Sequence, residues 1–217
     1  MRVVLFGATG FVGRGVLFES LAAQEVSQVL VVGRNSCGVS HNKLTEILVQ
    51  DFGDLSDIAD QLTDLDACFW CLGISSGGMD EETYTRITNT YTIHGAKILK
   101  ANNPEMVFCF VSGEGADGSA MWARVKKRTE EELQQLGFPS VLVFRPAFIQ
   151  DKHGATLRGI VYKVGYAIMI LFSPLLRMFG WGTSNAEIGK AMIVAVRDKH
   201  ADSILPSGAI NELADKL

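Results

Sequence analysis

The sequence predicts an α/β fold: a doubly wound parallel sheet covered by helices on both faces. Three observations support this prediction. Short apolar runs alternate along the chain with helical patterns, and the connections between them are short. The runs are nearly continuous in valine, leucine and phenylalanine, which is typical of strands buried on both faces. A glycine-rich turn directly follows the first apolar run and precedes the first helical pattern.

Each expected strand is one of these apolar runs. Strands are expected at residues 3–6, 29–32, 46–50, 68–72, 107–111 and 141–144. Helices are expected at about 12–23, 55–62, 81–101 and 120–136, with two or three more after residue 158. Right-handed crossovers between such units make the sheet parallel, and ligands then bind at the carboxyl ends of its strands.

The composition is that of one globular domain over residues 1–217, with 47% hydrophobic and 20% charged residues. Strict alternation ends near residue 147, so residues 147–217 are expected to build a helical substrate lid. The net charge is −4 and no long basic run occurs, which argues against nucleic acid as a partner. Because the chain enters the first strand at residue 2, a signal or transit peptide has no room, and a cytoplasmic or organelle-surface location is expected.

The glycine turn at residues 7–13 has the spacing GxxGxxG between a buried strand and a helix. In a dinucleotide-binding unit, the first glycine permits a tight turn, the second a close approach to the pyrophosphate, and the third close helix packing. The phosphates then meet the positive N-terminus of the helix. The turn therefore predicts that NAD or NADP is bound by Gly7, Thr9, Gly10, Phe11, Val12 and Gly13.

The end of the second strand indicates which of the two nucleotides is bound. NAD sites usually have an acidic residue there for the ribose 2′-hydroxyl, whereas an arginine accommodates a 2′-phosphate. Here the strand ends in Gly33-Arg34-Asn35, without Asp or Glu. A charge-assisted contact from Arg34 to the phosphate favours NADP(H) over NAD(H). In the alternative, Arg34 is a surface side chain that caps the loop.

The third strand is followed by Asp51 and Phe52, where a carboxylate and the next backbone N–H can meet the adenine edge. Asp51 can equally cap the helix that starts near Leu55. Both interpretations of Asp51 remain open on sequence.

The fourth strand ends in Cys71-Leu72-Gly73, whose backbone is expected alongside the cofactor ribose. Cys68 and Cys71 form a CxxC pattern typical of zinc or redox sites. However, their spacing on a strand directs the two sulfurs to opposite faces. The pattern therefore predicts buried structural thiols.

Taken in order, seven motifs resemble the short-chain dehydrogenases/reductases of the atypical kind, and most closely their Tat-interacting-protein-like oxidoreductase branch. The motifs are GATGFVG, VVGRN, VQDFGDL, CFWCLGISSG, FVSGEGA, RVKKRTEEEL and VFRPAFI, and they run through almost the whole chain. The resemblance implies a Rossmann fold, NADP(H) binding, and oxidation or reduction at a carbonyl/alcohol carbon. It also implies regulatory roles through protein partners in some relatives.

The resemblance also implies roles for individual residues. Ser112 matches the serine that holds the substrate oxygen, and Lys126 matches the lysine that binds the nicotinamide ribose and lowers the pKa of a catalytic tyrosine. In the alternative, Lys126 is a solvated charge on the helix surface. The tyrosine position holds Trp122, whose indole N–H donates a hydrogen bond but has no accessible acid/base couple.

A substitute proton donor is sought in the helix after the fourth strand. Tyr84, Tyr91 and His94 can share one helix face there, and Tyr91 or His94 is expected to donate the proton if that face meets the cleft. His153 is a further candidate. The resemblance places the backbone of Pro146 and Ala147 beside the nicotinamide, and Arg145 is expected to pair with a helix carboxylate.

Residues 160–181 are rich in apolar side chains, but the uninterrupted stretch is too short to span a bilayer. This segment either covers the substrate pocket or docks on a partner or membrane surface. Two functions therefore remain: an NADPH-dependent oxidoreductase acting on a small-molecule substrate, and a non-catalytic NADP(H)-binding regulator that recognises a protein partner.

Overall fold

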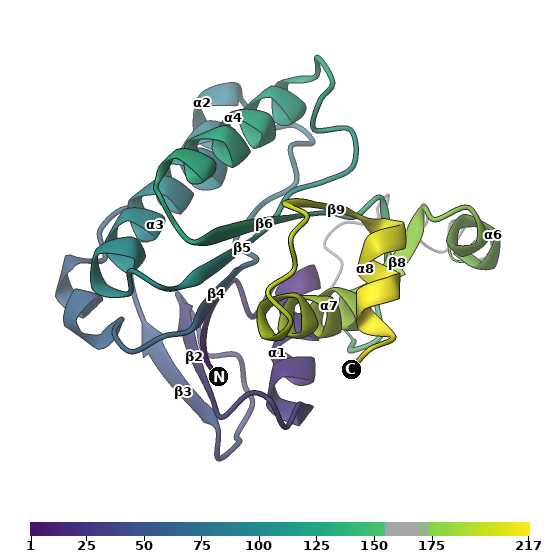
Figure 1. The fold of residues 1–217 in the computed structure, drawn as a ribbon. Coiled ribbons are helices and arrows are strands. Elements are labelled where there is room, and N and C mark those ends of the chain that lie inside the picture. The colour runs from purple at the N-terminus through teal and green to yellow at the C-terminus, as the bar shows by residue number, and fades with distance from the viewer. Residues whose placement is uncertain (155–169, 171–172) are drawn as a thin grey trace.

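The computed structural model describes residues 1–154, 170 and 173–217. Its centre is a seven-stranded parallel sheet in the order β3-β2-β1-β4-β5-β6-β9 (Figure 1). The strands are β1 (Arg2–Phe6), β2 (Gln28–Gly33), β3 (Leu44–Leu48), β4 (Ala67–Trp70), β5 (Val107–Val111), β6 (Ser140–Arg145) and β9 (Ile204–Pro206). Strand order reverses between β1 and β4, so the predicted doubly wound sheet is confirmed.

Helices cover both faces of this sheet (Figure 1). One face carries α1 (Phe11–Ala22), α7 (Asn185–Arg197) and α8 (Ser207–Ala214). The other carries the 3₁₀ helix η1 (Ser56–Gln61), α3 (Tyr91–Asn102) and α4 (Met121–Gln135). Before α3 lie the short helix α2 (Glu81–Thr85) and a π-helical turn, Arg86–Thr90. A helix α6 (Ser173–Met178) and a small parallel pair, β7 (Phe148–Gln150) and β8 (Gly182–Ser184), complete the described elements.

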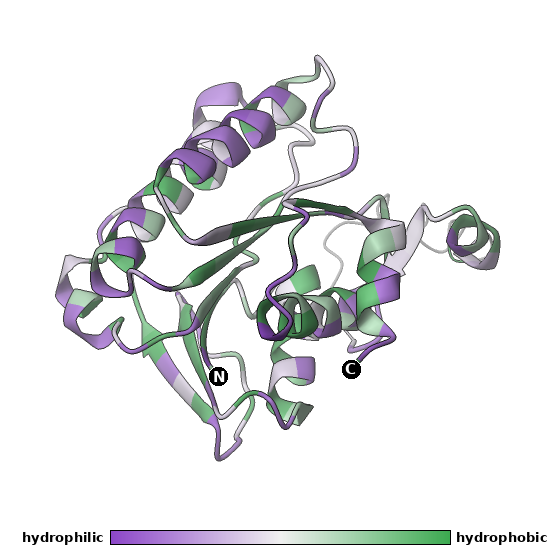
Figure 2. Cartoon of the chain, in the orientation of Figure 1, coloured by the Kyte–Doolittle hydropathy of each residue, from purple (hydrophilic) through white to green (hydrophobic). Residues whose placement is uncertain are grey.

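The core follows from the alternation of side chains along the strands. Val3 and Leu5 point to the layer of α1 and α7, whereas Val4 and Phe6 point to the layer of α3 and α4. All four side chains are fully buried. Figure 2 shows the apolar colouring along the strands and polar stripes on the outer sides of the helices. Burial on both faces explains why these strands are nearly continuous in apolar residues.

The expected strand positions hold with small shifts: the third strand starts two residues earlier than expected, at Leu44, and the fourth ends at Trp70. The sequence did not predict β9, which is only three residues long and ends in Pro206. The expected lid portion, residues 147–217, also builds the core. It supplies β9 and α7, whose side chains from Ala191 to Ala195 are fully buried.

The C-terminal α7 packs closely on α1 through two glycines. A Cβ atom on Gly189 would lie 2.9 Å from Val16 Cα, and one on Gly15 would overlap the backbone of Asn185. The side chain of Asn185 donates to the carbonyl of Phe11 (3.1 Å) at the start of α1. The last third of the chain therefore holds the first turn of α1 in place.

The sulfurs of Cys68 and Cys71 lie on opposite faces of the sheet, as predicted. Cys68 belongs to the cluster beneath α3 and α4, whereas Cys71 packs against the cluster beneath α1 and α7. All four cysteines are free thiols. Burial raises the pKa of the Cys68 and Cys71 thiols. Neither the geometry nor the ionisation of this pair suits a CxxC redox or zinc site.

Candidate functional site

The glycine turn after β1 is tight enough to exclude side chains. Gly7 has a φ of +85°, and a Cβ atom there would lie 2.6 Å from the carbonyl oxygen of Cys71. The amide of Gly10 donates to the carbonyl of Gly7 (2.9 Å), and a Cβ on Gly13 would overlap that same carbonyl. Each glycine thus meets a steric need of a strand–turn–helix unit in which backbone lies close to backbone.

The N-terminus of α1 opens between two hollows. One, of about 110 Å³, is lined by Thr9, Arg34 and Phe52, among others. The other, of about 380 Å³, is lined by Phe11, Lys126 and others, and we call it the cleft. Gly10, at the N-cap of α1, has no side chain to block the first turn. A dinucleotide fits this arrangement, because its pyrophosphate can meet the helix N-terminus while its two halves enter the two hollows.

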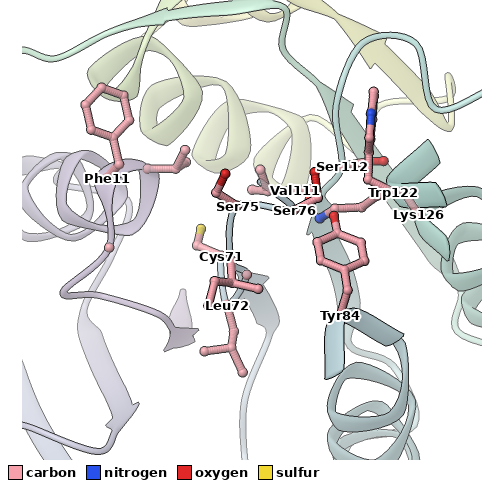
Figure 3. A pocket seen from close by; sticks show the side chains of 14 residues that line it. Phe11, Cys71, Leu72, Ser75, Ser76, Tyr84, Val111, Ser112, Trp122 and Lys126 are labelled. Carbon is pink, nitrogen blue, oxygen red and sulfur yellow. Dashed lines mark hydrogen bonds between the residues drawn. The ribbon is translucent and has the colours of Figure 1, made fainter. Parts of the chain in front are cut away.

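The cleft is built from the carboxyl ends of β4 and β5 together with α1, α2 and α4 (Figure 3). Its wall includes the backbone after β4, three serines, one phenol, one indole and one amine. The lining residues are Gly10, Phe11, Val12, Cys71, Leu72, Gly73, Ile74, Ser75, Ser76, Tyr84, Val111, Ser112, Trp122 and Lys126. Most cofactor residues predicted near the ribose and nicotinamide thus lie along one cavity.

Lys126 is held firmly at the wall of the cleft. Its Nζ donates to the carbonyl oxygen of Val111 (2.8 Å) and lies 4.7 Å from the centre of the Phe110 ring. Desolvation lowers the pKa of Lys126 to about 8. The amine is therefore mostly protonated at neutral pH and directed by a backbone carbonyl, so it is not the solvated helix-surface charge of the alternative interpretation.

The lowered pKa of Lys126 predicts a pH-dependent stability. Between pH 8 and 10.5 the folded chain has released the Lys126 proton that the unfolded chain still binds, so stability contributed by this group rises with pH. We expect the free energy of unfolding of the wild type, minus that of Lys126→Met, to grow by about 1–3 kcal/mol across this window. Urea denaturation at several pH values measures the difference, and a flat difference would contradict a desolvated Lys126.

Ser112 belongs to a buried polar network. Its hydroxyl donates to Glu130 Oε1 (2.5 Å), and Arg145 donates to both oxygens of the same carboxylate, at 3.1 and 2.5 Å. Arg145 also pairs with Asp117 at the surface (2.5 Å). The Arg145 guanidinium lowers the pKa of Asp117 to about 2, with help from Lys127. The expectation that Arg145 pairs with a helix carboxylate is confirmed, since Glu130 lies on α4.

The network affects what Ser112 can offer a ligand. Its single hydroxyl proton is directed to Glu130, so towards the cleft it presents lone pairs. In this orientation Ser112 accepts a hydrogen bond from an alcohol more readily than it donates one to a carbonyl. The substrate-holding role implied by the family resemblance stays a prediction.

Trp122 lies on the first turn of α4 and forms part of the cleft wall. Its ring packs against the loop after β5, where Cβ atoms built on Gly113 and Gly115 would lie 3.7 and 3.6 Å from it. The indole is thus a flat apolar surface beside Ser112 and Lys126.

The expectation that Tyr91 or His94 meets the cleft is wrong. The Tyr91 pKa is raised by burial and by a hydrogen bond to Asp51, which lies after β3 at the adenosine end of the site. His94 lies near the charge of Asp54 in the same region, and its Nε2 is buried without a partner among the described residues. The π-helical turn at Arg86–Thr90 rotates each residue by less than an α-helix does, so α2 and α3 present different faces.

Asp51 is not a helix cap. Its Oδ1 accepts from the amide of Gly53 (2.9 Å), and this bond lowers its pKa. The amide of Ser56, at the start of η1, instead donates to Asp54 (3.0 Å). Phe52 lines the smaller hollow and Asp51 precedes it in the chain, so both remain predicted adenosine contacts.

The other sequence candidates lie outside the cleft. His153 contacts Glu19 of α1 (2.8 Å) and stacks on Phe18, so it does not serve as a proton donor there. Ala147 lines a separate cavity of about 510 Å³, together with Trp181 and others. Pro146 is buried at the end of β6. Their predicted positions beside the nicotinamide stay predictions.

The predicted apolar segment 160–181 lies mostly outside the described residues. Within its described part, Leu175, Met178, Phe179 and Trp181 are strongly exposed. In the part of the chain that the structure describes, no helix is both long and apolar enough to cross a bilayer.

Sequence reasoning gave little weight to Tyr84 and did not single out Ser75 and Ser76, all of which line the cleft. The serines follow β4 directly, and residues after a strand's carboxyl end lie at the ligand-binding edge. That position was a usable signal for Ser75 and Ser76. For Tyr84 the decisive feature is the π-helical turn, which leaves no clear mark in the sequence.

Comparison with known proteins finds relatives in two groups. The chain is 28% identical to Protein HTATIP2 of Rattus norvegicus over 152 residues, which cover 68% of this chain and 62% of the rat protein. It is 26% identical to the mitochondrial protein fmp52 of Aspergillus niger over 207 residues, covering 89% and 86% of the two chains. Together with the fold, these relationships support the resemblance found in the sequence. The chain resembles the atypical short-chain dehydrogenases/reductases.

Solved structures support the fold. WbmH of Bordetella bronchiseptica, in complex with NAD⁺, matches with a TM-score of 0.71 and 17% identity over 99% of this chain and 79% of that chain. A short chain dehydrogenase family protein of Francisella tularensis matches with a TM-score of 0.66 and 17% identity, over 96% and 98% of the two chains. No protein-family model matches the chain.

The expected cytoplasmic location is contradicted. The fungal relatives, including proteins of Aspergillus oryzae, Meyerozyma guilliermondii and Aspergillus niger, are named mitochondrial. The expectation rested on the first strand beginning at residue 2, which does not determine location. The chain spans less than two thirds of the rat relative, 62%.

Proposed function

We propose that this chain binds NADP(H) across the glycine turn and reduces a carbonyl group of a small molecule in the cleft. One observation carries the proposal: the N-terminus of α1 lies between a hollow that contains Arg34 and a cleft that contains Lys126. An anion at the helix N-terminus would have a cation available on either side. The names of the fungal relatives make mitochondria the proposed location.

Different residues of the site would bind different parts of the nucleotide. The first turn of α1 would bind the pyrophosphate, Arg34 the 2′-phosphate and Lys126 the nicotinamide ribose. When bound, the nicotinamide supplies the hydride for carbonyl reduction. The Trp122 indole would cover the reacting region and limit the entry of water. Lys126, fixed by the Val111 carbonyl, keeps a positive charge next to the reacting oxygen below about pH 8.

The preference for NADP(H) rests on Arg34, and its removal should abolish that preference. Arg34 is exposed at the rim of the smaller hollow, where a 2′-phosphate can reach it. We expect Arg34→Ala to weaken NADPH binding about tenfold or more and to leave NADH binding nearly unchanged.

Isothermal titration calorimetry with both nucleotides measures this selectivity. Arg197→Ala is the matched control, because Arg197 is another surface arginine that pairs with Asp198 (2.7 Å) and Glu25 (3.1 Å), away from the site. Equal NADPH affinity in the wild type and Arg34→Ala would remove the basis for NADP(H) selectivity.

Trp122 favours a second candidate function, a non-catalytic NADP(H)-dependent regulator. An indole at the position of the family tyrosine cannot exchange a proton during turnover. This candidate predicts nucleotide binding with no NADPH consumption for any carbonyl compound tested. The reductase proposal requires another proton donor within the cleft.

A further inference from the structure

We infer that Tyr84 is the proton donor of this cleft, acting from α2 in place of the tyrosine that α4 lacks. The inference rests on the proposed reductase function and deepens it. Tyr84 is the sole phenol among the described residues that line the cleft, and it shares that wall with Ser112, Trp122 and Lys126. In Figure 3 its hydroxyl is directed toward the end of the Lys126 side chain.

The position of Tyr84 is fixed by short local contacts. Asp80 caps α2 by accepting from the amide of Thr83 (2.8 Å), and the amide of Tyr84 donates to the Asp80 carbonyl (3.1 Å). Glu81 on the same helix pairs with Arg124 of α4 (2.9 Å). These contacts tie α2 to the helix that carries Lys126. The Tyr84 side chain is almost wholly buried, with 3% of the residue exposed.

The other polar groups of the cleft serve less well as acids. The Ser112 proton is bound to Glu130, and the hydroxyls of Ser75 and Ser76 have no acid/base couple near neutral pH. The Cys71 thiol, which also lines the cleft, is a weak hydrogen-bond donor, and burial raises its pKa. Burial raises the pKa of Tyr84 by more than a hydrogen bond with Thr88 lowers it, so the phenol is protonated at neutral pH.

The proton transfer can be written with its full balance. A substrate carbonyl carbon gains a hydride, with its two electrons, from the reduced nicotinamide, and the carbonyl π pair moves onto oxygen. That oxygen takes the proton of Tyr84 Oη, so the phenol O–H bond breaks and the alcohol O–H bond forms. Tyr84 is left as a phenolate in the cleft that Lys126 also lines, and it regains a proton from water. The carbonyl is reduced by two electrons, NADPH is oxidised to NADP⁺, and one solvent proton is consumed.

Tyr84→Phe tests this role, because it removes only the hydroxyl. With NADPH and two carbonyl probes, 4-nitrobenzaldehyde and acetophenone, we expect kcat to fall about 10²–10⁴-fold. The calorimetric Kd for NADPH should stay unchanged, which also shows that the variant is folded. Ser27→Ala is the control, because it removes a hydroxyl that donates to the Met1 carbonyl (3.1 Å), away from the site, and it should retain wild-type turnover. In the Tyr84→Phe background, Trp122→Tyr should restore part of the lost activity.

A second readout does not depend on turnover. The ultraviolet difference signal of tyrosinate, taken as wild type minus Tyr84→Phe, reports the ionisation of Tyr84. We expect Lys126→Met to move this titration to higher pH, because the phenolate loses its cation. An unchanged titration would overturn the inference.

The possible outcomes separate the two proposals. If the wild type reduces the probes and Tyr84→Phe does so equally fast, the inference about Tyr84 fails and the reductase proposal stands. If the wild type binds NADPH but consumes none with either probe, the reductase proposal fails and the role of Tyr84 as a donor fails with it. Both proposals are supported if Tyr84→Phe loses activity, the control does not, and Lys126→Met moves the Tyr84 titration to higher pH.

Discussion

Arg145→Met is expected to lower the free energy of unfolding by about 3–5 kcal/mol. The Arg145 and Glu130 side chains are only 8% and 5% exposed, and Arg145 donates to both carboxylate oxygens. Removal of the guanidinium leaves a buried carboxylate whose remaining protein donor in the network is the Ser112 hydroxyl. The loss of stability comes from the desolvation of an unpaired charge. This free-energy cost greatly exceeds the stabilisation that an exposed ion pair provides. Urea denaturation measures it.

Two further variants distinguish the effect of an unpaired Glu130 carboxylate from the effect of disturbed packing. Asp117→Asn removes the surface partner of Arg145, which is 62% exposed, and should cost less than about 1 kcal/mol. The double variant Arg145→Met/Glu130→Met removes both buried charges and should recover most of the lost stability. A double variant no more stable than Arg145→Met would show that packing, and not the unpaired carboxylate, explains the loss.

Gly13→Ala is expected to weaken NADPH binding by at least about tenfold and to destabilise the fold by about 1–3 kcal/mol. The new methyl group would overlap the carbonyl of Gly7, so α1 would have to move away from the turn. The helix N-terminus would then no longer lie where the pyrophosphate meets it. Calorimetric titration with NADPH measures the effect on binding.

Gly208→Ala is the matched control, because a Cβ atom there meets nothing within 4 Å and its backbone is not strained. It should bind NADPH like the wild type. Wild-type affinity in Gly13→Ala would show that the turn does not contact the nucleotide.

The pattern of apolar runs was sufficient to predict the sheet because each strand of its centre is buried on both faces. Leu5 and Phe6 illustrate this, since they pack into opposite layers. The glycine turn was equally readable, because its spacing reflects backbone contacts within one short segment. In both cases the structural requirement acts on residues that are close together in the chain, so it appears as a readable sequence pattern.

Most features that depend on contacts between distant segments could not be predicted, although the pairing of Arg145 with a helix carboxylate was. No sequence motif indicates that Ser112 donates to Glu130, because the contact depends on how α4 packs beside β5. The interpretation of Tyr91 and His94 failed because it assumed one regular helix, whereas a π-helical turn separates α2 from α3. The same turn leaves Tyr84 at the cleft.

The most direct test is the crystal structure of the protein grown with NADP⁺. We predict the pyrophosphate at the first turn of α1, the adenosine 2′-phosphate beside Arg34, and the nicotinamide in the cleft between Tyr84 and Lys126. Density for the nucleotide at another place, or an empty cleft at saturating NADP⁺, would contradict the assignment of this cleft as the cofactor and reaction site.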